Sequence, residues 1–280
     1  MKLIDIEKLL RWAYCEELIK DKPQRTGPAP VKSAWASVGS FAELLTRVDD
    51  NRYGVLPDLD SEGEPHPDAV CVHHAVARLD GRGIVLSRKW NPMPELMKFE
   101  SYADQALDQA RSVLVRTGAN GVPVLRQSLS VLVRKVAVLG HAPDGAGECP
   151  ELKALTGANG APIGFREVVE HSVGPFGEVR EFAYEVDDGW DARRKGLKPG
   201  AYFKFQLSPD PIPVLVERGE FALYRMALDE LAENLRGKLS EFEPVATRRS
   251  WRPWDGGMGA DWSGGVFGRI LKGVNSAEVT

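Results

Sequence analysis

The sequence predicts an α+β fold, with a helical N-terminal part followed by an antiparallel sheet and a long C-terminal helix. Up to about Val115, apolar residues recur three and four positions apart, which is typical of amphipathic helices. Beyond it, segments rich in β-branched residues and segments that alternate apolar with polar residues favour strands. We therefore expect three regions: a mainly helical region at 1–115, a sheet with the long helix at 116–239, and a tail or docking arm rich in glycine and tryptophan at 240–280.

The helical region begins with an amphipathic segment at 5–20. Ser40 and Glu43 have the spacing of a capping box, so a short helix is expected from residue 40, or from as early as 33, to 48. Pro67 suits the first turn of a helix that runs to 79. The apolar run at 84–86 is typical of a buried strand, and a further capped helix is expected at 101–114.

Four strands and one long helix are expected in the second region. The strands lie at 130–139, 165–171, 179–186 and 201–207, and they indicate an antiparallel meander. The helix carries an apolar stripe formed by Phe221, Tyr224, Leu228, Leu231 and Leu235. We expect Leu228 and Leu231 to be buried against the sheet.

Composition excludes several classes of protein. The 280 residues include 36 Lys and Arg against 40 Asp and Glu, a net charge of −4, so no whole-chain basic field attracts nucleic acid. No apolar run has the length of a membrane helix, and we expect no membrane association. The three cysteines, Cys15, Cys71 and Cys149, are odd in number and widely spaced. Such cysteines are typical of reduced thiols, and with no secretory signal at the N-terminus they predict a cytoplasmic protein.

The motifs of the common nucleotide-binding and hydrolytic sites are missing from the sequence. It has no P-loop, no dinucleotide-binding glycine motif, no nucleophile elbow and no His-Glu-x-x-His, so we expect no cofactor and name no catalytic residue. Cys71 and His74 are one helical turn apart, but two ligands do not make a zinc site unless His141 and Cys149 complete it. The alternative places Cys71 and His74 beside Arg78 on the polar side of a surface helix. We therefore expect no bound metal.

The tail combines basic and aromatic residues. From Thr247 to Gly273 it holds five cations and two anions, interleaved with aromatic side chains. The candidate partner-binding residues are Arg248, Arg249, Trp251, Arg252, Trp254, Trp262 and Phe267. Three interpretations remain open: the tryptophans pack on the protein's own fold, they anchor in the groove of a protein partner, or they stack on nucleic acid bases while the arginines contact phosphates.

Short segments resemble uncharacterised proteins encoded in bacterial prophages. They are 9–14, the helix start at 66–70, and the triplet Arg252-Pro253-Trp254 after the final helix. The resemblance implies a phage or mobile-element origin and no particular activity. From the residues we expect a non-enzymatic cytoplasmic interaction or regulatory protein that binds a protein partner through its surface and aromatic tail. The sequence is also compatible with a homo-oligomer. The alternatives are a nucleic-acid-binding protein that uses the tail, and a zinc-dependent enzyme that uses Cys71 and His74.

Overall fold

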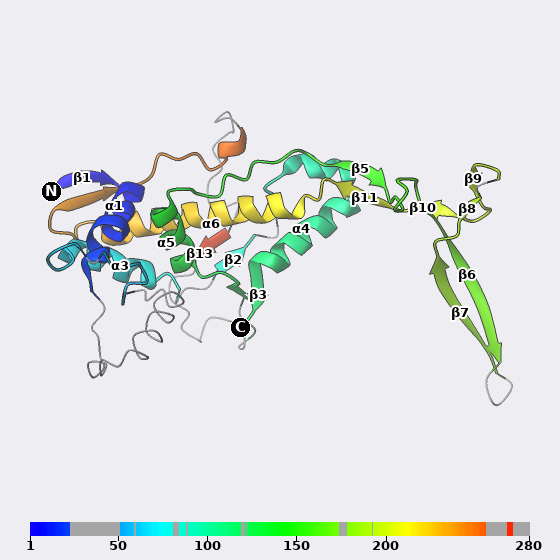
Figure 1. The fold of residues 1–280 in the computed structure, drawn as a ribbon, viewed down its shortest axis with the longest axis horizontal. Helices are drawn as coiled ribbons and strands as arrows, with labels where there is room; N and C mark the ends of the chain where they lie inside the picture. The colour runs from blue at the N-terminus through cyan, green and yellow to red at the C-terminus, as the bar shows by residue number, and fades with distance from the viewer. Residues whose placement is uncertain are drawn as a thin grey trace, which may run out of the picture. The chain divides into compact units, whose positions relative to one another are not determined.

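The computed structural model describes residues 1–22, 51–58, 60–80, 84–87, 89–118, 121, 123–173, 178–191, 193–255 and 268–270. Its helices and largely antiparallel strands confirm the predicted α+β fold (Figure 1). The chain forms two compact units that interleave along the sequence. The first comprises Met1–Pro92, Arg111–Ala146 and Leu215–Thr280, and the second comprises Met93–Ala110 and Gly147–Val214. The three consecutive regions expected from the sequence do not follow this division.

The N-terminal segment of the first unit is helical, as predicted at 5–20. Strand β1 (Lys2–Asp5) leads into α1 (Ile6–Trp12), and a π turn (Ala13–Glu17) and a 3-10 turn (Leu18–Lys20) continue it. The Asp5 side chain caps α1 by accepting a hydrogen bond from the Glu7 backbone N–H at 2.9 Å. The helix expected at 33–48 lies outside the described residues.

Three further predicted elements are confirmed. They are α3 (Pro67–Ala77), β2 (Ile84–Leu86) and α4 (Ser101–Leu114). After α4, β3 (Val115–Thr117) pairs antiparallel with β4 (Pro123–Leu125), while β2 pairs antiparallel with β13 (Gly268–Ile270).

The strand predicted at 130–139 is wrong, because this segment is helix α5 (Leu129–Leu139). Ser128 caps its start, and Gly140 ends it with φ at 74°. Its buried residues are Leu129, Ser130, Leu132, Val133, Val136 and Ala137. They lie three and four positions apart on one helical face, and burial of this face overrides the strand preference of the valines.

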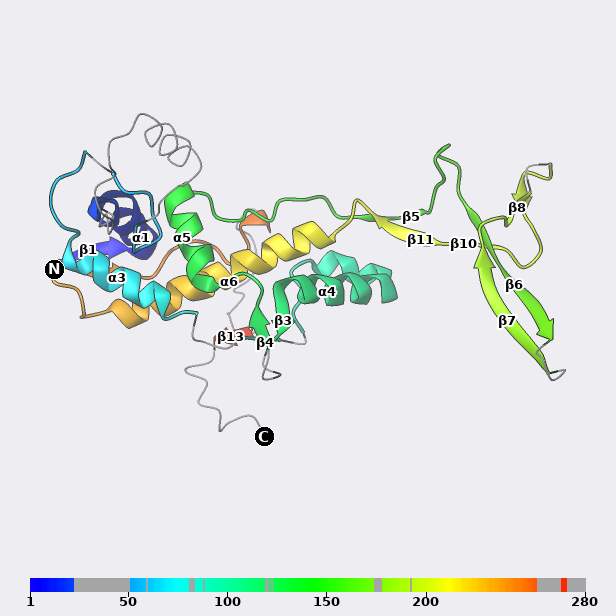
Figure 2. The ribbon, with the colours of Figure 1, turned by 60° about the horizontal axis from the view of Figure 1, so that its bottom comes forward.

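Helix α6 (Ile212–Leu235) is longer than the helix predicted at 221–235. Leu228 and Leu231 are fully buried, which confirms that half of the prediction. The other half, that both leucines pack against the predicted sheet, stays a prediction. Figures 1 and 2 show α1, α3 and α5 gathered around the C-terminal half of α6.

The chain after α6 returns to the N-terminus. Strand β12 (Phe242–Val245) runs parallel to β1, with Lys2 opposite Phe242 and Asp5 opposite Val245. A 3-10 turn follows at Pro253–Asp255. The first residues of the predicted tail are therefore part of the first unit.

The second unit contains short strands and one long hairpin. A 3-10 helix at Pro94–Phe99 precedes the first turns of α4. The strands are β5 (Glu151–Ala154), β6 (Gly164–Val173), β7 (Val179–Val186), β8 (Trp190–Asp191), β9 (Gly196–Leu197), β10 (Tyr202–Phe203) and β11 (Phe205–Ser208).

The pairing of these strands differs from the predicted meander. β6 and β7 confirm the strands predicted at 165–171 and 179–186, and they pair with each other. The strand predicted at 201–207 is split, because β10 pairs with β6 whereas β11 pairs with β5. The sheet order is β10-β6-β7, so the meander is wrong.

Candidate partner-binding surfaces

Five of the seven predicted partner-binding residues lie in the described part of the tail. They are Arg248, Arg249, Trp251, Arg252 and Trp254, whereas Trp262 and Phe267 lie outside the described residues. The segment that carries the five runs from the end of α6 through β12 to the 3-10 turn at Pro253–Asp255. Its contacts therefore show what the first half of the tail does.

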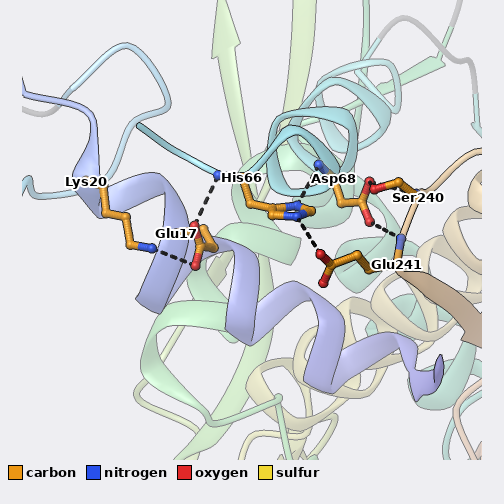
Figure 3. A network of polar contacts seen from close by, with 6 residues as sticks. All are labelled: Glu17, Lys20, His66, Asp68, Ser240 and Glu241. Carbon is orange, nitrogen blue, oxygen red and sulfur yellow. Dashed lines mark hydrogen bonds and ion pairs between the residues drawn. The ribbon is translucent and has the colours of Figure 1, made fainter. Parts of the chain in front are cut away.

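The start of this segment is held by Asp68 of α3 (Figure 3). The Asp68 carboxylate, whose residue is only 3% exposed, accepts hydrogen bonds from the backbone N–H of Ser240 at 2.8 Å and of Glu241 at 2.9 Å. The Ser240 hydroxyl adds a third bond at 2.9 Å. Burial opposes ionisation of this carboxyl, but the three hydrogen bonds outweigh burial and lower the pKa of Asp68 below its ordinary value. Asp68 thus fixes the entry to β12 as an ionised clamp.

His66 extends the clamp towards α1 (Figure 3). Its Nδ1 accepts the backbone N–H of Asp68 at 3.1 Å, which caps α3 and places the ring proton on Nε2. Nε2 faces a Glu241 carboxylate oxygen at 3.4 Å. The His66 backbone N–H donates to Glu17, which also binds Lys20 at 2.7 Å. The network joins the turns after α1, the start of α3 and the tail.

Two arginines of α6 receive the tryptophans of the tail. Arg225 lies over the Trp251 ring at 5.0 Å, and Arg218 lies over the Trp254 ring at 4.8 Å. Trp254 also meets Phe221 edge-on, with ring centroids 5.6 Å apart. The two arginines are seven residues apart, which is two helical turns, so they stand on the same face of α6. Cation–π pairs of this kind contribute about 0.5–2 kcal/mol each.

Backbone and charge contacts complete the docking of the tail. Arg225 donates to the carbonyl oxygens of Thr247 at 3.3 Å and Arg249 at 3.2 Å. Arg249 makes a two-pronged ion pair with Glu7 at 2.8 and 3.0 Å, and its hydrogen bond to Glu7 raises the pKa of Arg249. These contacts favour self-packing for Trp251, Trp254 and Arg249. Binding of a partner by the seven tail residues stays a prediction.

Cys71 and His74 line a pocket of about 370 Å³ between α3 and the end of α6. Arg78, Asn234 and Lys238 share its wall. In the described ranges, no group of three or more His, Cys, Asp or Glu side chains has a geometry that suits a metal ion. Cys15, Cys71 and Cys149 are all free thiols. The arrangement of Cys71 and His74 beside Arg78 in this pocket agrees with the interpretation of a polar helix face.

A larger hollow of about 1130 Å³ shares Pro67, Val70 and His74 of α3 with this pocket. Lys20, Asp21 and Arg52 stand on its wall, and their charges are engaged nearby. Lys20 binds Glu17 at 2.7 Å and Arg52 binds Asp21 at 3.0 Å. Three charges on the wall of the hollow are therefore already paired.

The β6–β7 hairpin (Figure 1) belongs to the second unit and carries several exposed apolar side chains. Residues that lie opposite one another in the register of β6 and β7 point to the same face of the hairpin. Because successive residues alternate between the two faces, the side chains form two sets. We call the first the aromatic face: Arg166, Val168, Glu170, Ser172, Arg180, Phe182, Tyr184 and Val186. We call the second the valine–glutamate face: Glu167, Val169, His171, Val173, Val179, Glu181, Ala183 and Glu185.

Both faces of the hairpin expose apolar side chains. On the aromatic face Phe182 is 53% exposed and Tyr184 is 42% exposed. On the valine–glutamate face Val169, Val173 and Val179 are 50%, 73% and 65% exposed. A monomeric protein normally covers at least one face of a strand pair with its own core. This surface lacks such a cover among the described residues.

Polar contacts at the aromatic face pair its charges with one another. Arg166 donates two hydrogen bonds to the Asp188 carboxylate, at 2.5 and 2.8 Å. These bonds hold the pKa of Asp188 well below its ordinary value. Arg180 binds Glu178 at 2.7 Å. The Tyr184 hydroxyl donates to Glu170 at 2.5 Å, which raises the pKa of Tyr184.

Two glycines shape the base of the hairpin. The Gly189 backbone N–H donates to the Gly164 carbonyl oxygen at 2.8 Å. A Cβ on Gly164 would lie 2.8 Å from the Gly189 carbonyl carbon and 2.9 Å from the Trp190 nitrogen. Because both obstacles are backbone atoms, only glycine permits this approach. The base of the hairpin is thus closed by backbone contact.

Sequence analysis predicted both strands of the hairpin but not its exposure. A signal was present in its charge. Residues 164–188 hold seven acidic and two basic residues, a net charge of −5 with His171 neutral, whereas the whole chain carries −4. A strand pair inside a core rarely carries so much charge. The net negative charge of this hairpin, which exceeds that of the entire protein, therefore indicates an exposed hairpin.

The chain matches no protein-family model, and no curated protein or solved structure is significantly similar to it. Within the described ranges, each helix is too short or too polar to cross a membrane. The phage origin that the resemblance implies stays a prediction.

Proposed function

We propose that the protein is a non-enzymatic cytoplasmic interaction protein that binds another protein through the β6–β7 hairpin. The observation that carries this proposal is the exposure of apolar side chains on both faces of a two-stranded hairpin. A two-stranded hairpin alone is marginally stable in water, and apolar patches of this kind mark interaction sites. A partner that covers either face supplies the burial that the described residues do not.

The free edge of β7 supports the same role. In the sheet order β10-β6-β7, β7 has no partner strand on its outer side among the described residues. β10 covers β6 only at Gly164 and Phe165. Unpaired strand edges are templates for a strand of another chain, which is a common mode of peptide recognition.

The hairpin does not support the nucleic-acid alternative. Its net charge of −5 repels phosphates. In the tail, Arg249 is neutralised by Glu7. A protein partner is therefore the better occupant.

Site-specific cross-linking tests the proposal. A photoreactive phenylalanine analogue replaces Val179, which is 65% exposed on the valine–glutamate face, and a control chain carries the same analogue at Val138, which is 46% exposed on α5. We expect one protein to be captured from position 179 and not from position 138, and Val169→Ser in the position-179 chain to reduce the capture. Equal capture from both positions, or capture from position 179 that Val169→Ser leaves unaffected, would contradict the proposal.

A further inference from the structure

We infer that the partner presents a basic surface, and that the hairpin receives it on the valine–glutamate face. The inference rests on the proposed function and names the chemistry of the partner. Its starting point is the concentration of charge: residues 164–188 carry −5, so the other residues of the chain together carry +1. The negative field of the protein is thus concentrated on the hairpin, where it attracts a basic partner and repels an acidic one.

The two faces differ in how much of this charge is already neutralised. Both arginines of the hairpin lie on the aromatic face, where Arg166 binds Asp188 and Arg180 binds Glu178. The valine–glutamate face has three glutamates and no arginine or lysine of the hairpin. Among the described residues no cationic side chain pairs with Glu167, and Glu181 faces only His171, at 3.5 Å. Glu167 and Glu181 on this face therefore lack a lysine or arginine partner among the described residues, against Glu170 alone on the aromatic face.

One cross-strand pair on this face is repulsive as it stands. Glu167 lies directly opposite Glu185 in the register of β6 and β7. Like charges in this position destabilise a strand pair. Tyr202 and Lys204 relieve Glu185 by binding its carboxylate, and these hydrogen bonds lower the pKa of Glu185. Glu167 keeps its charge unrelieved, and a partner cation placed beside it would stabilise the hairpin as well as the complex.

The apolar residues of the same face define what accompanies the cations. Val169 stands between Glu167 and His171 along β6, and Val179 precedes Glu181 by two residues on β7. Side chains on one face of a strand recur about 7 Å apart. A partner that alternates lysine or arginine with apolar side chains therefore places its cations near the glutamates while its apolar groups cover the valines.

A synthetic peptide of about ten residues that alternates lysine with valine tests this inference on the full-length chain. A peptide that alternates glutamate with valine is the matched control probe. We expect the lysine–valine peptide to bind, more weakly as salt increases, and the glutamate–valine peptide not to bind.

Two charge reversals locate the site. Glu181→Lys on the valine–glutamate face and Glu170→Lys on the aromatic face change the charge equally, and both residues are exposed. We expect Glu181→Lys to weaken binding of the lysine–valine peptide about tenfold or more, and Glu170→Lys to weaken it about twofold or less. Circular dichroism shows that both variants are folded.

Several outcomes would overturn the inference. Equal weakening by both variants would show attraction to net charge alone. Self-association that Glu181→Lys abolishes would show that a second copy of this chain binds the valine–glutamate face. Tight binding of duplex DNA to the hairpin would show that the partner is a nucleic acid. If a partner is captured from position 179 but these peptide results fail, the proposed function stands and the inference of a basic partner is wrong.

Discussion

The Asp68 clamp leads to a quantitative prediction about stability. Asp68→Ala removes three hydrogen bonds, from Ser240 N–H, Ser240 Oγ and Glu241 N–H, all between 2.8 and 2.9 Å. A hydrogen bond to a charged group contributes about 1.5–3 kcal/mol, and the two backbone N–H groups would be left without their acceptor. Since the three bonds share one carboxylate, their effects do not simply add. We expect the free energy of unfolding to fall by about 3–5 kcal/mol.

Urea denaturation followed by circular dichroism measures this loss, and amide hydrogen exchange at Ser240 and Glu241 localises it. Ser240→Ala is the matched control, because it removes only the hydroxyl bond and is expected to cost about 1 kcal/mol. Both amides are expected to exchange faster in Asp68→Ala than in Ser240→Ala. A loss below about 1 kcal/mol for Asp68→Ala would refute the clamp, since ordinary surface changes stay within about 0.5 kcal/mol.

The same carboxylate gives the protein a pH dependence with a defined sign. The pKa of Asp68 is lowered in the folded state, so folding favours the ionised form. The stabilisation is complete above the unfolded pKa, near 4, and is lost as pH falls through the lower folded pKa. Asp68→Asn keeps the shape but not the charge, and its stability is expected to fall less steeply below pH 4 than that of the native chain. Identical acid profiles for the two proteins would refute this account.

Three further predictions concern packing. Leu228→Ala truncates a fully buried side chain and is expected to cost about 2–5 kcal/mol in urea denaturation; a loss below 1 kcal/mol would mean that the stripe is not core. Gly164→Ala drives a methyl group into the backbone of Gly189 and is expected to disrupt the hairpin base, seen as faster amide exchange in β6 and β7; unchanged exchange would contradict the close approach. Trp254→Ala loses its contacts with Phe221 and Arg218 and is expected to cost about 1–3 kcal/mol, whereas no loss would favour the partner-anchor interpretation.

Local patterns in the sequence predicted most helices and the hairpin, because their signals lie within a few residues. The predicted start of α3 at Pro67, the capped helix at 101–114 and the strands β6 and β7 agree with the structure. The segment at 130–139 was misassigned because its valines favour strands in isolation. Its helical state depends on which face is buried, and burial is set by residues far away in the chain.

The candidate surfaces depended even more on distant contacts. Nothing near Asp68 in the sequence indicates that it binds residues 240 and 241, which lie about 172 positions away. Trp251 and Trp254 were predicted as partner anchors because the arginines that stack on their rings, Arg225 and Arg218, are on a different element. The exposure of β6 and β7 is equally invisible to a period-two pattern, which predicts alternation but not whether a core covers the inner face.

The pairing of β1 with β12 has a consequence for how the chain is synthesised. Residues 2–5 find their strand partner only at residues 242–245, so the first unit cannot complete this contact until nearly the whole chain has left the ribosome. Both segments of the second unit, Met93–Ala110 and Gly147–Val214, emerge before β12 does. Contacts between such distant residues form late, because closing a long loop costs entropy before any bond is gained. The hairpin therefore leaves the ribosome before the N-terminal strand can pair with β12.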